Sequence, residues 1–130
     1  MSSLLETRFA DHNRGVYFVG TTPPRSNTSV ERVDEIADKL LERLSALDID
    51  GLIVYDIQDE SSRIDKPRPF PYMETHDPRE YSKLIREKSG HPVITYKSVS
   101  QRDKADFNQW LNEAWDKYGI RDIVMVGSPS

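Results

Sequence analysis

Short apolar runs alternate with longer amphipathic stretches along this chain. The apolar runs are rich in β-branched residues and begin near residues 16, 52, 93 and 121. They predict four strands, at Gly15–Val19, Gly51–Tyr55, Pro92–Tyr96 and Ile120–Val126. The second run is apolar almost throughout, which is typical of a parallel strand that is buried on both faces.

The stretch after the first strand predicts a helix that opens at Thr28. The Thr28 hydroxyl is placed to cap the helix, and Glu31 stands three residues later, as in a capping box. The apolar positions recur at helical spacing, so one side of the helix should face a core. These positions are Val30, Val33, Ile36, Ala37, Leu40, Leu41, Leu44 and Leu47.

Two further helices are predicted between the later strands. The first has Asp77 as its cap and Pro78 at its first position, and it ends at Gly90. The second opens at Ser100 with Asp103 and stops at Gly119. The core-facing residues should be Tyr81, Leu84 and Ile85 in the first, and Phe107, Trp110, Leu111, Ala114, Trp115 and Tyr118 in the second.

The order of elements is therefore β-α-β-α-β-α-β, which indicates an α/β fold with parallel strands joined by right-handed crossovers. The units repeat every 30 to 40 residues or so, a spacing typical of a (βα)₈ TIM barrel, which needs about 250 residues. We therefore expect residues 1–130 to form a single α/β unit, the first half of such a barrel and the N-terminal part of a longer domain. A small, complete α/β binding module is the alternative.

Composition narrows the range of functions. The 18 Lys and Arg are outnumbered by 22 Asp and Glu, and no basic block is present, so we expect no nucleic-acid partner. The absence of cysteine excludes disulfides and thiolate chemistry, and the three histidines lie outside metal-ligand spacing, so no metal site is expected. No apolar run approaches the roughly 20 residues of a membrane span. A cytoplasmic protein without a membrane partner is expected, and homo-oligomerisation is left open.

Ligands of parallel α/β folds bind at the carboxyl ends of the strands. The segments that follow the four strands are Gly20–Asn27, Asp56–His76, Lys97–Ser100 and Gly127–Ser130. The second spans 21 residues, more than the roughly 12–15 beyond which loops are uncommon, and it is rich in charge. It is therefore a candidate to cover a cofactor or substrate, with a solvated surface loop as the structural alternative.

Smaller candidates lie in the other segments. Thr21, Thr22 and Arg25 are suited to an anionic group, although the adjacent prolines also serve simply to turn the chain. Tyr96 and Lys97 leave the third strand. Lys97 either pairs with a phosphate or carboxylate or is an ordinary exposed lysine.

Four segments, in order, resemble the N-terminal half of methylenetetrahydrofolate reductase and its flavin-linked relatives: Phe18–Arg25, Gly51–Arg63, Pro92–Tyr96 and Gly119–Gly127. The family has Pro-Pro-Lys/Arg at the end of its first strand, Ser-Thr-Arg after its second and Arg-Gly-Asp after its fourth. The matching residues here are Pro23, Pro24 and Arg25, then Ser61, Ser62 and Arg63, and finally Gly127.

The resemblance implies a TIM-barrel oxidoreductase that reduces a folate-bound one-carbon unit with FAD or NAD(P)H as the hydride source. The family's proton-donating glutamate falls on Gly20, its flavin-proximal aspartate on Ser128 and a histidine on Tyr96. Asp59 or Glu60 is then the candidate general acid, because a carboxyl group is needed for that role near neutral pH. The residues implied in cofactor or ligand contact are Thr21, Thr22, Arg25, Ser62, Arg63, Tyr96, Lys97, Gly127 and Ser128.

The departures from the family pattern keep a second function open. A catalytically silent barrel that binds a folate-like or nucleotide ligand would retain the geometry without the missing carboxylate. In either case the expected partner is a small molecule, and the 130-residue chain alone is expected to lack enzymatic activity.

Overall fold

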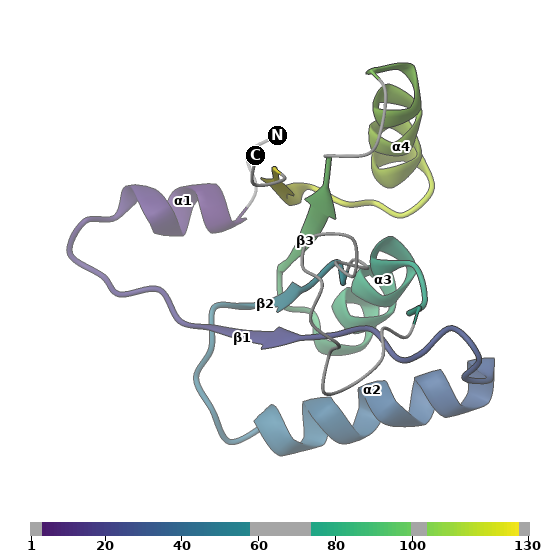
Figure 1. Ribbon diagram of the computed structural model, residues 1–130. Coiled ribbons are helices and arrows are strands. Elements are labelled where there is room, and N and C mark those ends of the chain that lie inside the picture. The colour runs from purple at the N-terminus through teal and green to yellow at the C-terminus, as the bar shows by residue number, and fades with distance from the viewer. Residues whose placement is uncertain (1–3, 58–73, 100–103, 128–130) are drawn as a thin grey trace, which may run out of the picture.

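The computed structural model describes residues 4–57, 74–99 and 104–127. Within them, four strands form one parallel sheet in the order β1-β2-β3-β4 (Figure 1). The elements are, in chain order, α1 (Leu4–Ala10), β1 (Phe18–Thr21), α2 (Val30–Leu44), β2 (Gly51–Val54), α3 (Pro78–Ser89), β3 (Val93–Ser98), α4 (Lys104–Asp116) and β4 (Asp122–Val126). The predicted α/β class with consecutive parallel strands is confirmed.

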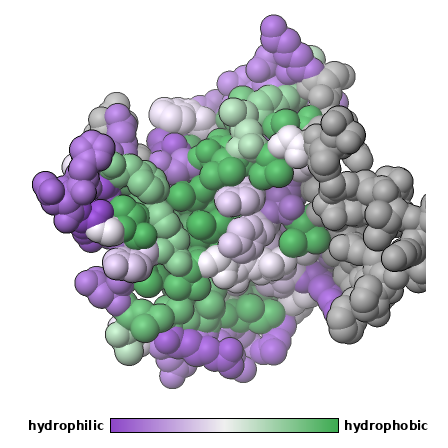
Figure 2. Space-filling model, turned by 60° about the vertical axis from the view of Figure 1, so that its left-hand side comes forward, coloured by the Kyte–Doolittle hydropathy of each residue, from purple (hydrophilic) through white to green (hydrophobic). Residues whose placement is uncertain are grey.

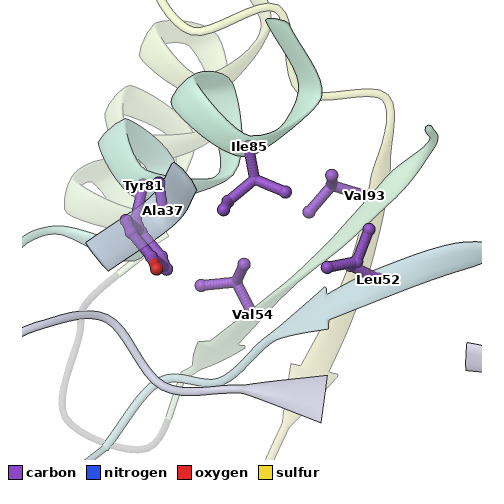
Figure 3. Packing of buried hydrophobic residues seen from close by; sticks show 6 residues of the cluster. All are labelled: Ala37, Leu52, Val54, Tyr81, Ile85 and Val93. Atoms are coloured by element: carbon purple, nitrogen blue, oxygen red, sulfur yellow. The ribbon is translucent and has the colours of Figure 1, made fainter. Parts of the chain in front are cut away.

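The main core lies between the sheet and helices α2 and α3. Leu52 and Val54 point from β2 toward Ile85 of α3, and these side chains are fully buried (Figure 3). Ala37 of α2, Tyr81 of α3 and Val93 of β3 complete the cluster. We call this side of the sheet the helix face.

Helix α4 covers the helix face beside β4. Trp110, Ala114, Tyr118 and Ile120 are buried together, and Ile123 of β4 packs against them. Ile123 is paired in register with Thr95, whose hydroxyl donates to Ser82 Oγ of α3 at 2.7 Å. Helices α2, α3 and α4 therefore all cover one face, as right-handed crossovers between strands in consecutive order require.

The opposite side of the sheet, the open face, is not covered by these three helices. Because side chains alternate along a strand, it carries Phe18, Gly20, Gly51, Ile53, Tyr55, Ile94, Tyr96 and Val124. Helix α1 lies on this side, where the Phe9 and Phe18 ring centroids are 5.8 Å apart. Figure 2 turns the α1 side toward the viewer and shows hydrophobic residues gathered across the centre of the molecule. Among the described residues, α1 covers the amino end of the open face.

Helix α1 was not predicted, and its attachment is long-range. The buried Asp50, which precedes β2, accepts a hydrogen bond from the Tyr17 backbone N–H at 2.9 Å and pairs with Arg14. Arg8 of α1 donates to the Asp50 carbonyl oxygen at 2.9 Å and lies 3.0 Å from its carboxylate. One carboxylate therefore fastens α1 and the segment before β1 to the amino end of the sheet.

Two predicted boundaries near the amino terminus are wrong. The first strand is shifted to Phe18–Thr21, because its pairing with Gly51–Val54 sets the register. The cap of α2 is Ser29 rather than Thr28. The Ser29 hydroxyl accepts from Arg32 N at 3.2 Å, whereas the Thr28 N–H donates to the Arg25 carbonyl oxygen within a turn.

The predicted ends of α3 are confirmed. Asp77 accepts from Arg79 N at 2.9 Å, Pro78 occupies the first position, and Gly90 has the positive φ of 73° that favours glycine at a helix end. The predicted start of the third helix at Ser100 and Asp103 lies outside the described residues.

Three residues predicted to face a core are exposed instead. Val30 lies at the first turn of α2, and Leu47 lies beyond its end. Trp115 is 57% exposed because it points away from the α4 core, where the Arg121 guanidinium lies 3.6 Å from its ring centroid. The fourth strand begins at Asp122, two residues later than predicted.

The buried phenol of Tyr81 should make the stability of the protein fall at alkaline pH. Burial raises the pKa of Tyr81, so the unfolded chain loses the proton first. This contribution to stability is complete below the unfolded pKa, about pH 10, and is lost as pH rises through the folded pKa. Denaturant unfolding of Tyr81→Phe between about pH 9 and 11 should show a shallower decline than the wild type. An unchanged slope in Tyr81→Phe would contradict this assignment.

Candidate functional site

The parallel register brings polar residues to the carboxyl edge of the sheet. Thr21 ends β1, Asp56 follows β2 by two residues, Lys97 lies near the end of β3 and Gly127 follows β4. Ligands of parallel α/β folds bind at this edge, so its surroundings form the candidate site.

Asp56 and Lys97 meet on the helix face of this edge. Their charged atoms, Oδ2 and Nζ, are 3.8 Å apart, and their side chains are only 10% and 11% exposed. The Ser98 backbone N–H also donates to Asp56 Oδ2 at 2.8 Å. Lys97 is therefore buried beside a carboxylate of its own chain, so the interpretation of it as an exposed lysine is wrong.

A pocket of about 150 Å³ surrounds this pair, closed by the first turn of α3 and by α4. Its lining residues are Asp56, Asp77, Pro78, Arg79, Lys97 and Trp110. The Lys97 ammonium lies 5.2 Å from the Trp110 ring centroid, close enough for a cation–π contact.

Arg79 holds the wall of this pocket together. It contacts both carboxylate oxygens of Asp77, at 2.8–3.2 Å, and donates to the Trp110 carbonyl oxygen and to Glu113. Its guanidinium also lies over the rings of Trp110 and Tyr118, at 4.8 and 4.9 Å. Burial opposes the charge, but hydrogen bonding to Asp77 and the nearby negative groups outweigh it and raise the pKa of Arg79. Arg79 thus stays charged and joins α3 to α4.

The charged side chains around this pocket are paired with one another. Lys97 faces Asp56, while Arg79 faces Asp77 and Glu113. A pocket this small and internally paired is suited to fixing the ends of β2 and β3 against the helices, and at most to receiving a small polar group of a ligand.

A larger groove of about 340 Å³ contains two of the predicted residues, Thr21 and Thr22. It runs along α2 and has three cationic residues in its wall, Arg32, Lys39 and Arg43. Arg32 is paired with Glu35 at 2.9 Å. With two threonines and three cationic side chains in its lining, the groove is chemically suited to an anionic group.

The backbone of Arg25 pairs with the segment that precedes α3. It forms an isolated antiparallel bridge with Thr75, flanked by hydrogen bonds from Ser26 N to the Glu74 carbonyl oxygen (2.9 Å) and from His76 N to that of Pro24 (2.8 Å). The end of the long segment Asp56–His76 is thereby fastened to the turn after β1. This geometry fits the alternative in which the prolines turn the chain.

Tyr96 and Lys97, which are both implied in ligand contact, lie on opposite faces of the sheet because side chains alternate along a strand. Tyr96 lies on the open face, where its ring meets that of Tyr55 edge to face, with centroids 5.1 Å apart. The structure thus divides the predicted contact set between two sides of the sheet.

Several predicted site residues lie outside the described residues, namely Asp59, Glu60, Ser62, Arg63 and Ser128. Gly127 is exposed after β4. Sequence reasoning did not single out Tyr55, Asp56, Asp77, Arg79 and Trp110 as a site. Tyr55 and Asp56 could have been identified as site residues, because they directly follow a buried strand. For Arg79 the sequence offers no such signal beyond its place in the first turn of a helix.

Across residues 4–57, 74–99 and 104–127, no cluster of three or more metal-ligating side chains is found. In the same part of the chain, no helix has the length and hydrophobicity needed to span a membrane.

No family model and no curated protein matches the chain. Among solved structures, it is similar to a protein from Clostridium thermocellum that is described as uncharacterized and as binding two copies of 5-methyl-5,6,7,8-tetrahydrofolic acid. The two share 30% sequence identity, with a TM-score of 0.69 over 97% of this chain. The match covers 39% of the other protein, so this chain spans about two fifths of its length.

Proposed function

We propose that this chain is a folate-binding unit, which holds a tetrahydrofolate-type molecule at the carboxyl edge of its sheet. The observation that carries the proposal is the 30% identity, over 97% of the chain, to a structure described as binding 5-methyltetrahydrofolic acid. The chain's resemblance to methylenetetrahydrofolate reductase, which rests on its own motifs, points to the same class of ligand.

The proposed architecture is the first half of a (βα)₈ barrel. Doubly wound sheets reverse their strand order and carry helices on both faces. Here the order runs β1-β2-β3-β4, and α2, α3 and α4 all lie on one face. This arrangement supports a barrel segment whose open face would line the interior.

Binding is favoured over reduction by the surroundings of Gly20. In the reductases that the sequence resembles, this position carries the carboxylate that protonates the substrate. Here position 20 carries no carboxylate, and a Cβ built on it would lie 2.6 Å from Cζ of Tyr55, so a side chain at this position would require the Tyr55 ring to move. Reduction with FAD or NAD(P)H, with Asp59 or Glu60 as the acid, is the competing hypothesis.

The anionic part of a folate also has a candidate environment. The glutamate carboxylates of such a ligand match the charge of the groove beside Thr21 and Thr22, where Lys39 and Arg43 supply positive charge. This groove lies next to the carboxyl end of β1, so it is close to the edge where the ligand is proposed to bind.

Calorimetric titration with 5-methyltetrahydrofolate tests the proposal. We expect saturable binding, accompanied by a ligand-dependent rise in Tm. The absence of heat and of a Tm shift at ligand concentrations up to about 1 mM would contradict folate binding.

The same preparation separates binding from reduction. The proposed binding unit should be colourless and should not oxidise NAD(P)H in the presence of a methylene-folate. Visible flavin absorbance together with folate-dependent NAD(P)H oxidation would favour the reductase hypothesis instead.

A further inference from the structure

Two tyrosines meet at the carboxyl end of the open face. The rings of Tyr55 and Tyr96 are 5.1 Å apart between centroids and inclined at 84°. Tyr55 follows β2 directly, and its backbone N–H donates to the Thr21 carbonyl oxygen at 3.0 Å. The backbone hydrogen bonding between β1 and β2 thus extends to Tyr55 and fixes the position of its backbone, from which the ring projects.

Gly20 makes room for the Tyr55 ring. The three atoms nearest to a Cβ built on Gly20 all belong to Tyr55, and Cζ is 2.6 Å from it. Any side chain at position 20 would therefore displace Tyr55 from its place over β1. Gly20 and Tyr55 are a matched pair, in which the absence of one side chain sets the position of the other.

The rest of the open face restricts where a ligand can lie. Phe9 of α1 packs on Phe18 at the amino end of this face, and Phe18 in turn lies beside Gly51. Tyr55 at the carboxyl end is 36% exposed. An edge-to-face pair also leaves ring faces that the partner ring does not occupy. A flat molecule can therefore reach aromatic surface at the carboxyl end.

We propose that Tyr55 and Tyr96 form an aromatic platform against which the planar pyrimidine part of a reduced pterin packs, with Gly20 keeping room for Tyr55. The inference rests on the proposed folate binding and deepens it, by assigning the ring-recognition surface to the open face. Aromatic side chains stack on flat nitrogen heterocycles without requiring a particular pattern of hydrogen bonds. The phenol groups add a donor and an acceptor at the rim of the platform.

The test compares alanine variants in calorimetric titrations with 5-methyltetrahydrofolate. Tyr55→Ala and Tyr96→Ala should each weaken binding by about tenfold or more, the size typical of a lost aromatic stack. Tyr55→Phe keeps the ring and should stay within about threefold of the wild type. Tyr17→Ala is the matched control, because Tyr17 is 66% exposed and precedes β1 at the other end of the sheet; its affinity should be unchanged.

Gly20→Ala provides an independent test, because both tyrosines remain in the sequence and only the position of Tyr55 is expected to change. By displacing Tyr55 it should weaken ligand binding by about tenfold, while the protein stays folded because the Tyr55 side chain has a route into solvent. Should Tyr55→Ala fail to fold, Tyr55→Leu replaces the ring by apolar bulk and is expected to show the same loss of affinity.

A spectroscopic readout distinguishes packing from an indirect structural effect. Ligand added to the wild type should shift the aromatic proton resonances of Tyr55 and Tyr96 and leave those of Tyr17 in place. If the wild type binds while folded Tyr55→Ala and Tyr96→Ala variants bind equally well, the platform is overturned and folate binding stands. If the wild type itself does not bind, folate binding and the platform fall together.

Discussion

Replacing Arg79 by alanine should destabilise the protein by about 3 kcal/mol, the largest effect we expect from one side chain at the candidate site. The substitution removes the partner of Asp77 and Glu113 and leaves the Trp110 carbonyl oxygen without this donor. It also removes the guanidinium that lies over the Trp110 and Tyr118 rings. Both carboxylates are partly exposed, so we place the cost at the lower end of the range for a broken buried ion pair.

Denaturant unfolding measures this effect, and a fall in Tm of about 10 °C should accompany it. Lys83→Ala is the matched control on the same helix, because Lys83 forms only a 4.0 Å exposed pair with Glu87. It should change stability by no more than about 0.5 kcal/mol. Arg79→Lys keeps the charge but not the two-pronged contact with Asp77, so it should fall between the two. Equal stability of Arg79→Ala and Lys83→Ala would contradict the central role of Arg79.

Replacing Gly51 by alanine should cost about 2 kcal/mol or more, because the added methyl group meets backbone. A Cβ at this position would lie 2.7 Å from the Pro92 carbonyl oxygen, the atom that accepts the Leu52 N–H at 3.0 Å. It would also approach the Phe18 ring, at 3.1 Å. Strands β2 and β3 would have to separate at the point where their pairing begins.

Gly127→Ala is the control for this substitution, since among the described residues nothing apart from its chain neighbour comes within 4 Å of a Cβ at that position. Its free energy of unfolding should match that of the wild type to within about 0.5 kcal/mol. Gly51→Ala should lower the midpoint in urea without changing the slope, as expected for a loss of stability in a two-state transition. If Gly51→Ala unfolds at the same urea concentration as the wild type, the backbone at the start of β3 can move away from β2 more easily than the structure indicates, and this prediction is wrong.

Local signals account for what the sequence predicted correctly. A cap such as Asp77 and an end such as Gly90 depend on a few neighbouring residues, and the strands at β2 and β3 follow from continuous apolar runs. The consecutive parallel order followed from the alternation of these elements. Such features need no knowledge of distant contacts.

The features that were missed depend on residues far apart in the chain. Helix α1 is anchored through Asp50, 42 residues beyond Arg8, and Trp115 is exposed beside Arg121 rather than buried with its neighbours on α4. The Arg79 network likewise joins residues of α3 to Trp110 and Glu113 of α4. The separation of Tyr96 from Lys97, by contrast, follows from the two-residue period of a strand and was accessible from sequence.

Folate binding at the carboxyl edge is tested most directly by a ¹H–¹⁵N NMR titration of the chain with 5-methyltetrahydrofolate. We expect saturable shifts of backbone amides at the ends of the strands, including Thr21, Tyr55 and Tyr96, and unperturbed amides around Asp50 at the amino end. A spectrum that does not change, or one in which the shifts gather around α1 and Asp50, would contradict this expectation.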